Sequence, residues 1–136
     1  MSARRTALSE SDAKLASVRR GDGPTITGFS GGGFRVDDNV YHGLLISPTR
    51  ADGWRPPALH ALTDADVAPL LALDPPSEFL LLGTGPSLER PPPAFTRALE
   101  ARGIGIEAMD SRAAARAWGV LRAEGRRVAA ALYPLG

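Results

Sequence analysis

Short apolar runs alternate with helical segments through the second half of the chain, and this order constrains the fold more than any other feature. Strands are predicted at Glu78–Leu82, Ile104–Met109 and Arg127–Tyr133, and one helix separates each pair. Strands joined through single helices need crossover connections, which make them parallel. The sequence therefore predicts a C-terminal parallel βαβαβ unit and an α/β fold class.

Both helices of this unit carry recognisable start and stop signals. The first opens at Pro91-Pro92-Pro93 and closes at Gly103, and the second is capped by Asp110 or Ser111 and ends before Gly125. Apolar residues recur at helical spacing in each. In the first helix, residues at i, i+3, i+4 and i+7 are Phe95, Ala98, Leu99 and Arg102, and the predicted buried stripe of the second helix is Ala114, Ala117, Trp118 and Leu121.

The first half of the chain has the pattern of antiparallel strands joined by tight turns. Predicted strands are Thr25–Phe29, Phe34–Val36 and Val40–Ile46, separated by Gly31–Gly33 and by Asp37–Asn39. The third is apolar on both faces, so we expect one continuous, central strand that is covered on both sides. Its His42 is then expected to be a hydrogen-bonded core or interface residue.

Between the two halves, the residues from Pro48 to His60 are expected to form a loop anchored by Trp54. Thr63-Asp64-Ala65-Asp66 resembles a capped helix start with acidic residues in the first turn. Pro69 interrupts this helix, so we expect a short or kinked one.

The chain has 136 residues, which suits a single domain. Residues 1–23 are polar and lack a convincing apolar stripe, so a flexible N-terminal arm is predicted at 1–23 and one domain at 24–136. The first twenty residues contain Glu10, Ser11 and Asp12 where a signal peptide needs an apolar block, and no run is long and apolar enough for a transmembrane segment. A cytoplasmic location is the expectation.

Charge and cysteine content narrow the classes of function. The 16 Lys+Arg and 15 Asp+Glu give a formal net charge of +1, which argues against nucleic acid and anionic membrane as partners. With no cysteine there is no disulfide, no thiolate nucleophile and no cysteine metal site. His42 and His60 lack partners at a metal-ligand or nucleophile spacing, so neither a metal site nor another cofactor is predicted.

The carboxyl ends of parallel strands are where α/β sheets bind ligands, and two turns should meet there. The candidate crevice comprises Gly83, Thr84, Gly85, Ser87, Asp110, Ser111 and Arg112. Backbone N–H groups of the glycine turn could hold an anion, with Arg112 as counter-charge. The residues equally fit a tight strand exit, because Leu88 breaks the dinucleotide fingerprint and no P-loop Lys-Ser or Lys-Thr follows.

Asp110 has two interpretations, a general base at this crevice or a helix N-cap. Capping alone explains it, and a carboxylate that accepts backbone N–H groups is a poor general base. No complete catalytic set is present, so the residues favour a non-enzyme while leaving an enzyme open. Five arginines lie along and just after the second helix, and we expect them to form a solvated surface rather than a binding face. They are Arg112, Arg116, Arg122, Arg126 and Arg127.

Six sequence blocks, read together in order and spacing, carry a family resemblance. They are Ile26-Thr27-Gly28-Phe29, Gly33-Phe34-Arg35-Val36, Tyr41-His42-Gly43 continuing to Pro48 and Trp54, Leu81-Leu82-Gly83-Thr84-Gly85, Gly103 to Asp110, and Leu121 to Leu132. Over about Pro24 to Tyr133 the chain resembles the family of the mitochondrial complex I assembly factor three and its bacterial and archaeal relatives of unassigned function. The family pattern has an Asn where this chain has Gly119, which puts in doubt any site that needs that amide.

The resemblance implies a three-layer β+β/α fold and a soluble protein that acts through protein contacts in assembling respiratory NADH dehydrogenase. It implies no enzymatic activity and no cofactor. The favoured hypothesis is therefore an interaction or assembly protein, with respiratory-complex subunits or a second copy of the chain as partners. Its docking surface is expected to be an apolar patch around Phe34, Tyr41 and Trp54. The alternative is a small-molecule or anion binder, or an enzyme, that uses the crevice.

Overall fold

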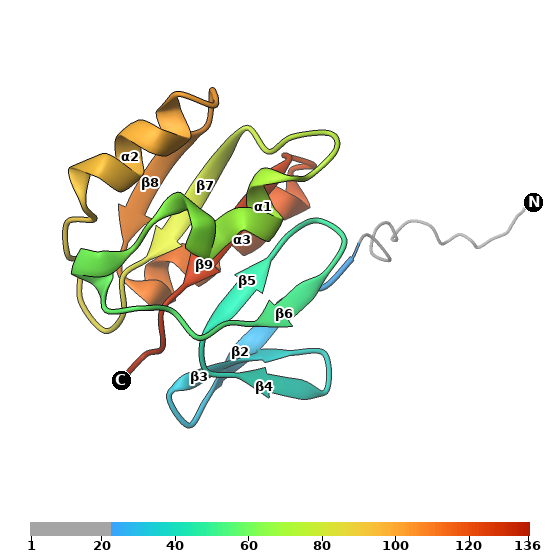
Figure 1. Ribbon diagram of the computed structural model, residues 1–136. Helices are drawn as coiled ribbons and strands as arrows, with labels where there is room; N and C mark the ends of the chain where they lie inside the picture. The colour runs from blue at the N-terminus through green and yellow to red at the C-terminus, as the bar shows by residue number, and fades with distance from the viewer. Residues whose placement is uncertain (1–22) are drawn as a thin grey trace, which may run out of the picture.

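The computed structural model describes residues 23–136, and these form two β-sheets with helices on both faces of the larger one (Figure 1). The predicted arm lies outside the described residues, except for Gly23. The smaller sheet is antiparallel, in the order β2 (Ile26–Ser30), β3 (Gly33–Val36), β4 (Asn39–Tyr41). The larger sheet has the order β6 (Ala51–Gly53), β5 (Leu44–Ile46), β9 (Val128–Leu132), β7 (Phe79–Gly83), β8 (Gly105–Met109).

The predicted parallel unit is confirmed. Strand β7 pairs in parallel with β8 on one side and with β9 on the other, while β5 joins β9 and β6 antiparallel. Helix α2 (Pro93–Glu100) connects β7 to β8, and α3 (Ser111–Ala123) connects β8 to β9. Gly103 (φ 78°) and Gly125 (φ 77°) adopt the left-handed conformation after these helices, as the sequence predicted.

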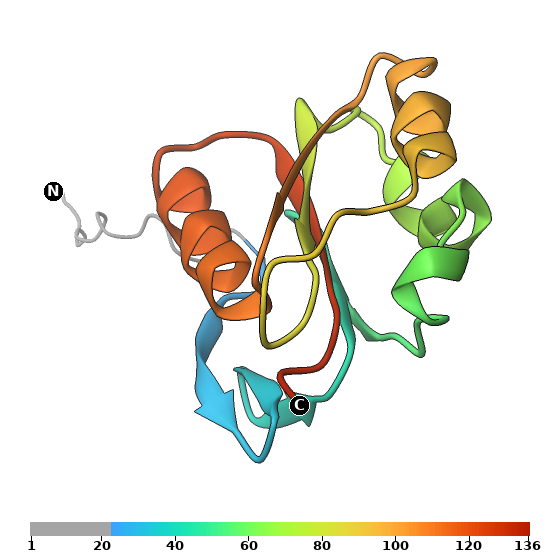
Figure 2. The ribbon, with the colours of Figure 1, turned by 90° about the vertical axis from the view of Figure 1, so that its left-hand side faces the viewer.

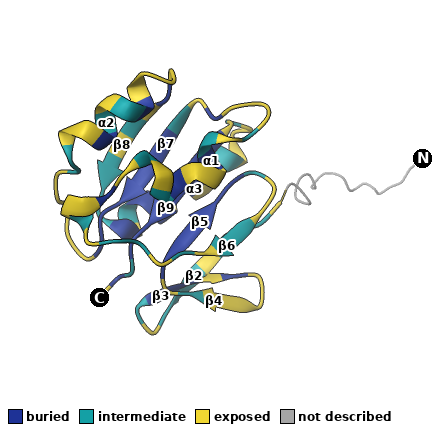
Figure 3. Ribbon diagram, in the orientation of Figure 1, coloured by how far each residue is buried: buried dark blue, intermediate teal, exposed yellow. Residues whose placement is uncertain are grey.

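Two apolar clusters, one on each face of the larger sheet, divide the molecule into three layers (Figure 2). On one face, Trp118 and Ala114 of α3 pack with Phe34 and Val36 of the smaller sheet. On the other, Phe95 and Leu99 of α2 pack with the segment that precedes β7. The three layers predicted from the resemblance are therefore present, and β9 lies buried at the centre (Figure 3).

The continuous strand predicted at Val40–Ile46 is wrong. The chain leaves the smaller sheet after Tyr41 and enters the larger one at Leu44, so β4 and β5 belong to different sheets. Gly43 lies in the break, where a Cβ atom would approach the Trp54 carbonyl oxygen to 2.2 Å, and the Trp54 N–H donates to the Gly43 carbonyl. His42 is exposed, so the core position expected for it is wrong, and the interface position stays a prediction.

The segment between β5 and β7 contains more structure than predicted. Strand β6 and a 3-10 turn η1 (Leu59–Ala61) fall where a loop was expected. The predicted capped start at Thr63 is confirmed, because Thr63 and Asp66 exchange the two hydrogen bonds of a capping box. It opens a 3-10 turn η2 (Asp64–Val67) that passes into the single α-turn α1 (Ala68–Leu71), as expected for a short helix containing Pro69.

Within residues 23–136, no helix is long and apolar enough to cross a membrane.

Candidate functional site

The turn after β7 and the start of α3 lie together at the carboxyl ends of the parallel strands. Thr84 is buried, and its N–H donates to the Met109 carbonyl at 2.9 Å. Its hydroxyl donates to the Ser87 carbonyl at 2.7 Å and accepts the Glu89 N–H at 3.0 Å. One threonine side chain thus fixes the course of the loop that follows β7.

Ser111 joins the same turn to the central strand. Its hydroxyl is buried, donates to the Tyr133 carbonyl at 2.7 Å and accepts the Gly85 N–H at 2.9 Å. The Ser111 N–H in turn donates to the Gly85 carbonyl at 2.8 Å. A Cβ atom on Gly83 would lie 2.7 Å from the Ser111 oxygen, so this close approach requires glycine.

Asp110 caps α3, because its side chain accepts the Ala113 N–H at 2.9 Å. Three backbone N–H groups that could have faced an anion therefore donate to side chains of the same chain. The acceptors are Ser111, Thr84 and Asp110. Arg112, by contrast, is exposed on the first turn of α3 and has no carboxylate partner within residues 23–136. The structure brings the turn after β7 and the start of α3 together, and the polar groups of Thr84, Asp110 and Ser111 bond to nearby parts of the chain. The Arg112 guanidinium lies instead over the Phe29 ring.

The arginines that follow along α3 do not form one continuous face. Arg112 and Arg116 lie over the Phe29 ring of β2, with guanidinium carbons 4.9 and 5.8 Å from its centre. Arg126 pairs instead with Glu78 at 2.8 Å, and this hydrogen-bonded contact lowers the pKa of the Glu78 carboxyl. The Arg122 side chain donates to the Arg126 carbonyl. Arg112 and Arg116 thus share one ring, whereas Arg126 lies over a different ring, that of Phe79, at 5.9 Å.

The apolar docking patch expected around Phe34, Tyr41 and Trp54 is wrong. Phe34 is completely buried, because it faces the larger sheet and stacks edge-on against Phe29 at 6.1 Å. Tyr41 and Trp54 are half-buried against the two apolar clusters. Large apolar side chains are instead exposed at Val40, Leu88 and Val120.

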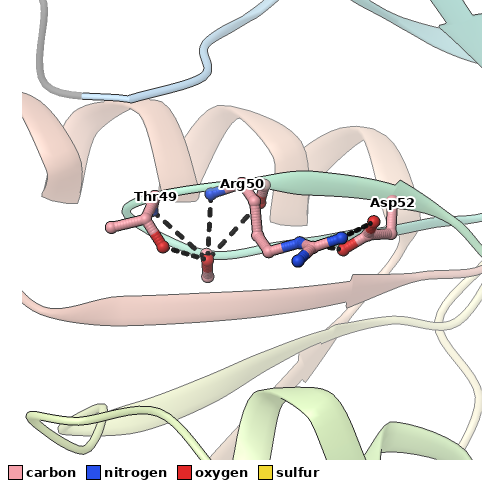
Figure 4. Close-up of polar contacts among 4 residues, drawn as sticks. Thr49, Arg50 and Asp52 are labelled. Atoms are coloured by element: carbon pink, nitrogen blue, oxygen red, sulfur yellow. Dashed lines mark hydrogen bonds and ion pairs between the residues drawn. The ribbon is translucent and has the colours of Figure 1, made fainter.

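A polar cluster that sequence reasoning missed closes the β5–β6 hairpin (Figure 4). The buried Ser47 hydroxyl accepts the N–H groups of Thr49 and Arg50 at 3.3 and 3.2 Å. Arg50 and Asp52 form a two-bonded ion pair at 2.8 and 2.7 Å on the exposed side. The Ser-Pro-Thr run was the available signal, since hydroxyl side chains that bond nearby N–H groups favour turns. These contacts are structural.

Three buried polar atoms have no hydrogen-bond partner among the described residues: the Ser77 hydroxyl, the Trp118 ring nitrogen and the Tyr133 hydroxyl. Tyr133 follows β9 and lies edge-on to Trp54, with ring centres 5.1 Å apart. Burial and, to a lesser degree, the charge of Asp66 raise the pKa of Tyr133 to about 12. Within residues 23–136, no three His, Asp or Glu side chains gather as a metal site requires.

A family model described as "Protein of unknown function (DUF498/DUF598)" matches residues 26–133, which include the whole crevice and both sheets. The chain belongs to this family. A relative from Rhodobacter capsulatus, described as an uncharacterized protein, is 38% identical over 111 residues, covering 81% of this chain and 84% of that protein. The resemblance predicted from the six sequence blocks is therefore confirmed.

A second relative carries a functional name. NADH dehydrogenase [ubiquinone] 1 alpha subcomplex assembly factor 3 of Bos taurus is 32% identical over 110 residues, which cover 80% of this chain. The chain matches 60% of the length of that bovine protein. Among solved structures, a Bordetella pertussis protein described as a Mth938-like domain has a TM-score of 0.71 and 30% identity, covering 83% of this chain and 87% of that one. The DUF498/DUF598 chain thus shares the Mth938-like fold.

Proposed function

We propose that this protein is a non-enzymatic interaction factor that acts in the cytoplasm and helps to assemble the respiratory NADH dehydrogenase. One observation carries the proposal: a protein named as an assembly factor for that enzyme is 32% identical over 80% of this chain. The family model matches residues 26–133, which build both sheets. An assembly factor needs a stable surface for its partners and no reaction centre. The fold of this chain supports the proposal because it supplies such a surface.

The carboxyl ends of the parallel strands support the same conclusion. At this edge, the Ser111 hydroxyl donates to a backbone carbonyl and the Asp110 carboxylate caps a helix. A serine nucleophile needs a base that accepts its proton, and here the acceptor is the Tyr133 carbonyl oxygen. The bonds of Ser111 and Asp110 to the backbone therefore support a structural role for these two side chains.

Affinity purification of the tagged full-length chain from its organism of origin, after mild solubilisation, tests the proposal. We expect NADH dehydrogenase subunits to be enriched over a purification with an unrelated tagged protein of similar size. If none of these subunits is recovered, although equal amounts of the two tagged proteins are purified, the proposal is contradicted. The predicted homodimer is a separate question, which light scattering at two protein concentrations answers.

The alternative function is an anion or small-molecule binder at Gly83, Thr84, Gly85, Ser87, Asp110, Ser111 and Arg112. Arg112, which follows Ser111 and has no carboxylate partner within residues 23–136, favours it. The internal use of the N–H donors of Gly85 and Glu89 weakens it. A thermal-shift screen with phosphates, nucleotides and carboxylates separates the two. A ligand that raises the melting temperature of the wild type and not of Arg112→Ala would favour the alternative.

A further inference from the structure

The side of α3 that faces away from the larger sheet carries a single row of exposed residues. They are Arg112, Arg116, Gly119, Val120 and Ala123, and we call them the outer face of α3. Their spacing of four, three, one and three residues places them on one side of a helix. The opposite side is buried through Ser111, Ala114 and Trp118. Figure 2 shows α3 at the edge of the molecule, on the face of the larger sheet opposite α2.

The first half of the outer face is positively charged. Arg112 and Arg116 both lie over the Phe29 ring, and within residues 23–136 neither has a carboxylate partner. Other arginines, such as Arg126 with Glu78, form ion pairs that offset their charge locally. Two like charges held beside one ring create a positive potential that an anionic group would lower.

The ring of Phe29 also limits the freedom of the two guanidinium groups. A cation over an aromatic face at this distance gains about 0.5–1 kcal/mol at an exposed site. The side chains are thereby partly ordered before any partner arrives, which reduces the entropy that binding would cost. Both arginines are exposed, so their N–H groups are accessible to carboxylates and can form paired hydrogen bonds with them.

The second half of the outer face is small and apolar. Val120 has 58% of its surface exposed, and Gly119 and Ala123 lie beside it on the helix. A Cβ atom on Gly119 would contact nothing within 4 Å, so packing inside the described chain does not require glycine there. Glycine inside a helix costs about 1 kcal/mol relative to alanine. A partner that approaches α3 closely is a reason for a residue without a side chain at this position.

We propose that the outer face of α3 docks an acidic amphipathic segment of a protein partner. Carboxylates of that segment pair with Arg112 and Arg116, and its apolar side chains pack on Val120 across Gly119. The distance along the helix from Arg112 to Val120 is about 12 Å, so the segment needs about two helical turns. The charge of the face selects an acidic partner rather than a basic or neutral one. This inference rests on the proposed function and names the surface that performs it.

The test places a photoreactive benzoylphenylalanine at Val120 of the full-length chain in its organism of origin. Mass spectrometry then reads the sequence of the cross-linked segment. The same residue at Leu88, which is 64% exposed on the loop after β7, is the matched control. We expect a predominant adduct from Val120, absent from Leu88, to a segment of another protein with two or more Asp or Glu within two helical turns.

Charge reversal decides whether the arginines provide the recognition. Arg112→Glu with Arg116→Glu should lower the adduct yield at least ten-fold, whereas the matched pair Arg112→Lys and Arg116→Lys should retain most of it. Both arginines are exposed, so circular dichroism and melting temperature should confirm that each variant folds. An adduct that is insensitive to charge reversal would overturn the proposal, as would adducts to a second copy, to residues 1–22 of the same chain, or none above the control.

Purification of the tagged variants separates this inference from the function on which it rests. If the wild type recovers NADH dehydrogenase subunits and the Glu variant recovers the same amount, the surface is wrong and the function stands. If the wild type recovers none of those subunits while Val120 still cross-links to an acidic segment in a charge-dependent way, the surface is correct and the function is wrong.

Discussion

At the scale of single residues, Tyr133 is a buried ionisable residue whose hydroxyl lacks a hydrogen-bond partner within residues 23–136. Its ring is buried beside Trp54, and its hydroxyl has no partner among the described residues. A buried hydroxyl without a hydrogen bond destabilises the folded state because it has lost its bonds to water. The same surroundings disfavour the phenolate.

We predict that Tyr133→Phe raises the free energy of unfolding by about 1 kcal/mol at pH 7, because it removes an unpaired polar atom without changing the shape of the ring. Urea denaturation at pH 7 measures the difference. A loss of stability of the same size would show that the hydroxyl has a bonding partner.

The stability difference between the wild type and Tyr133→Phe is also expected to depend on pH in alkaline solution. The pKa of Tyr133 is about 12 in the folded protein and about 10 in an unfolded chain, so deprotonation favours unfolding. The wild type therefore loses stability relative to Tyr133→Phe as the pH rises from about 10 towards 12. Urea denaturation at pH 9, 10 and 11 measures the gap, and a gap that stays constant would contradict the burial of the hydroxyl.

At the scale of secondary-structure elements, the Ser111 hydroxyl links the start of α3 to the ends of two strands. It bonds the Tyr133 carbonyl after β9 and the Gly85 N–H after β7. Ser111→Ala leaves both groups buried and unpaired, so we predict a fall in the free energy of unfolding of about 2–3 kcal/mol. Chemical denaturation measures it.

Ser87→Ala is the matched control for this prediction. Ser87 is exposed in the same region, and only its backbone carbonyl is bonded. Its substitution should change stability by less than about 0.5 kcal/mol. If the two alanine variants behave alike, Ser111 does not hold the strand ends together.

A second link between elements depends on pH. Glu78, just before β7, accepts hydrogen bonds from the Arg126 side chain and the Arg127 N–H, and both contacts lower its pKa. A carboxyl with a lowered pKa stabilises the fold above the ordinary glutamate pKa of about 4.3, and this contribution is lost as pH falls through the folded value.

We therefore predict that Glu78→Gln melts at a lower temperature than the wild type at pH 7, and that the difference disappears in more acidic solution. Thermal melts from pH 7 down to pH 3 measure this difference in melting temperature. Glu100→Gln, at an exposed position on α2 without an ion pair among the described residues, should melt like the wild type. A difference for Glu78→Gln that persists unchanged at pH 3 would rule out the ion pair as its cause.

Sequence reasoning succeeded where one local signal decides an element. Proline at the start of α2, Gly103 after it and the Asp110 cap of α3 each act within a few residues, so their positions could be predicted. The break at Gly43 could not, because it depends on the approach of the Trp54 backbone from another part of the chain. The alternating apolar residues of Val40–Ile46 fit one strand equally well.

The candidate site shows the same division. Parallel strands bring Thr84 and Ser111 to one edge, and the strand order predicted this. Which groups they bond could not be predicted, because the Tyr133 carbonyl and the Gly85 N–H meet Ser111 only in the folded chain. The stacking of Arg112 and Arg116 on Phe29 likewise joins segments more than eighty residues apart.

At the scale of the whole molecule, the smaller sheet and α3 cover one face of the larger sheet through a shared apolar cluster. Because Phe34 and Trp118 belong to the same cluster, neither sheet buries its apolar side alone. We predict that residues 24–136 unfold as one unit, with a single calorimetric transition whose calorimetric and van't Hoff enthalpies agree. Two resolved transitions would show separate domains.

The central claim is that this protein acts by contact during assembly of the NADH dehydrogenase. The most direct measurement is the amount of fully assembled enzyme, read from native gels of membranes, after deletion of the gene in its organism of origin. We predict a marked loss of assembled enzyme, restored by the wild type and by Arg112→Lys with Arg116→Lys. Assembly at the wild-type level in the deletion strain would contradict the account.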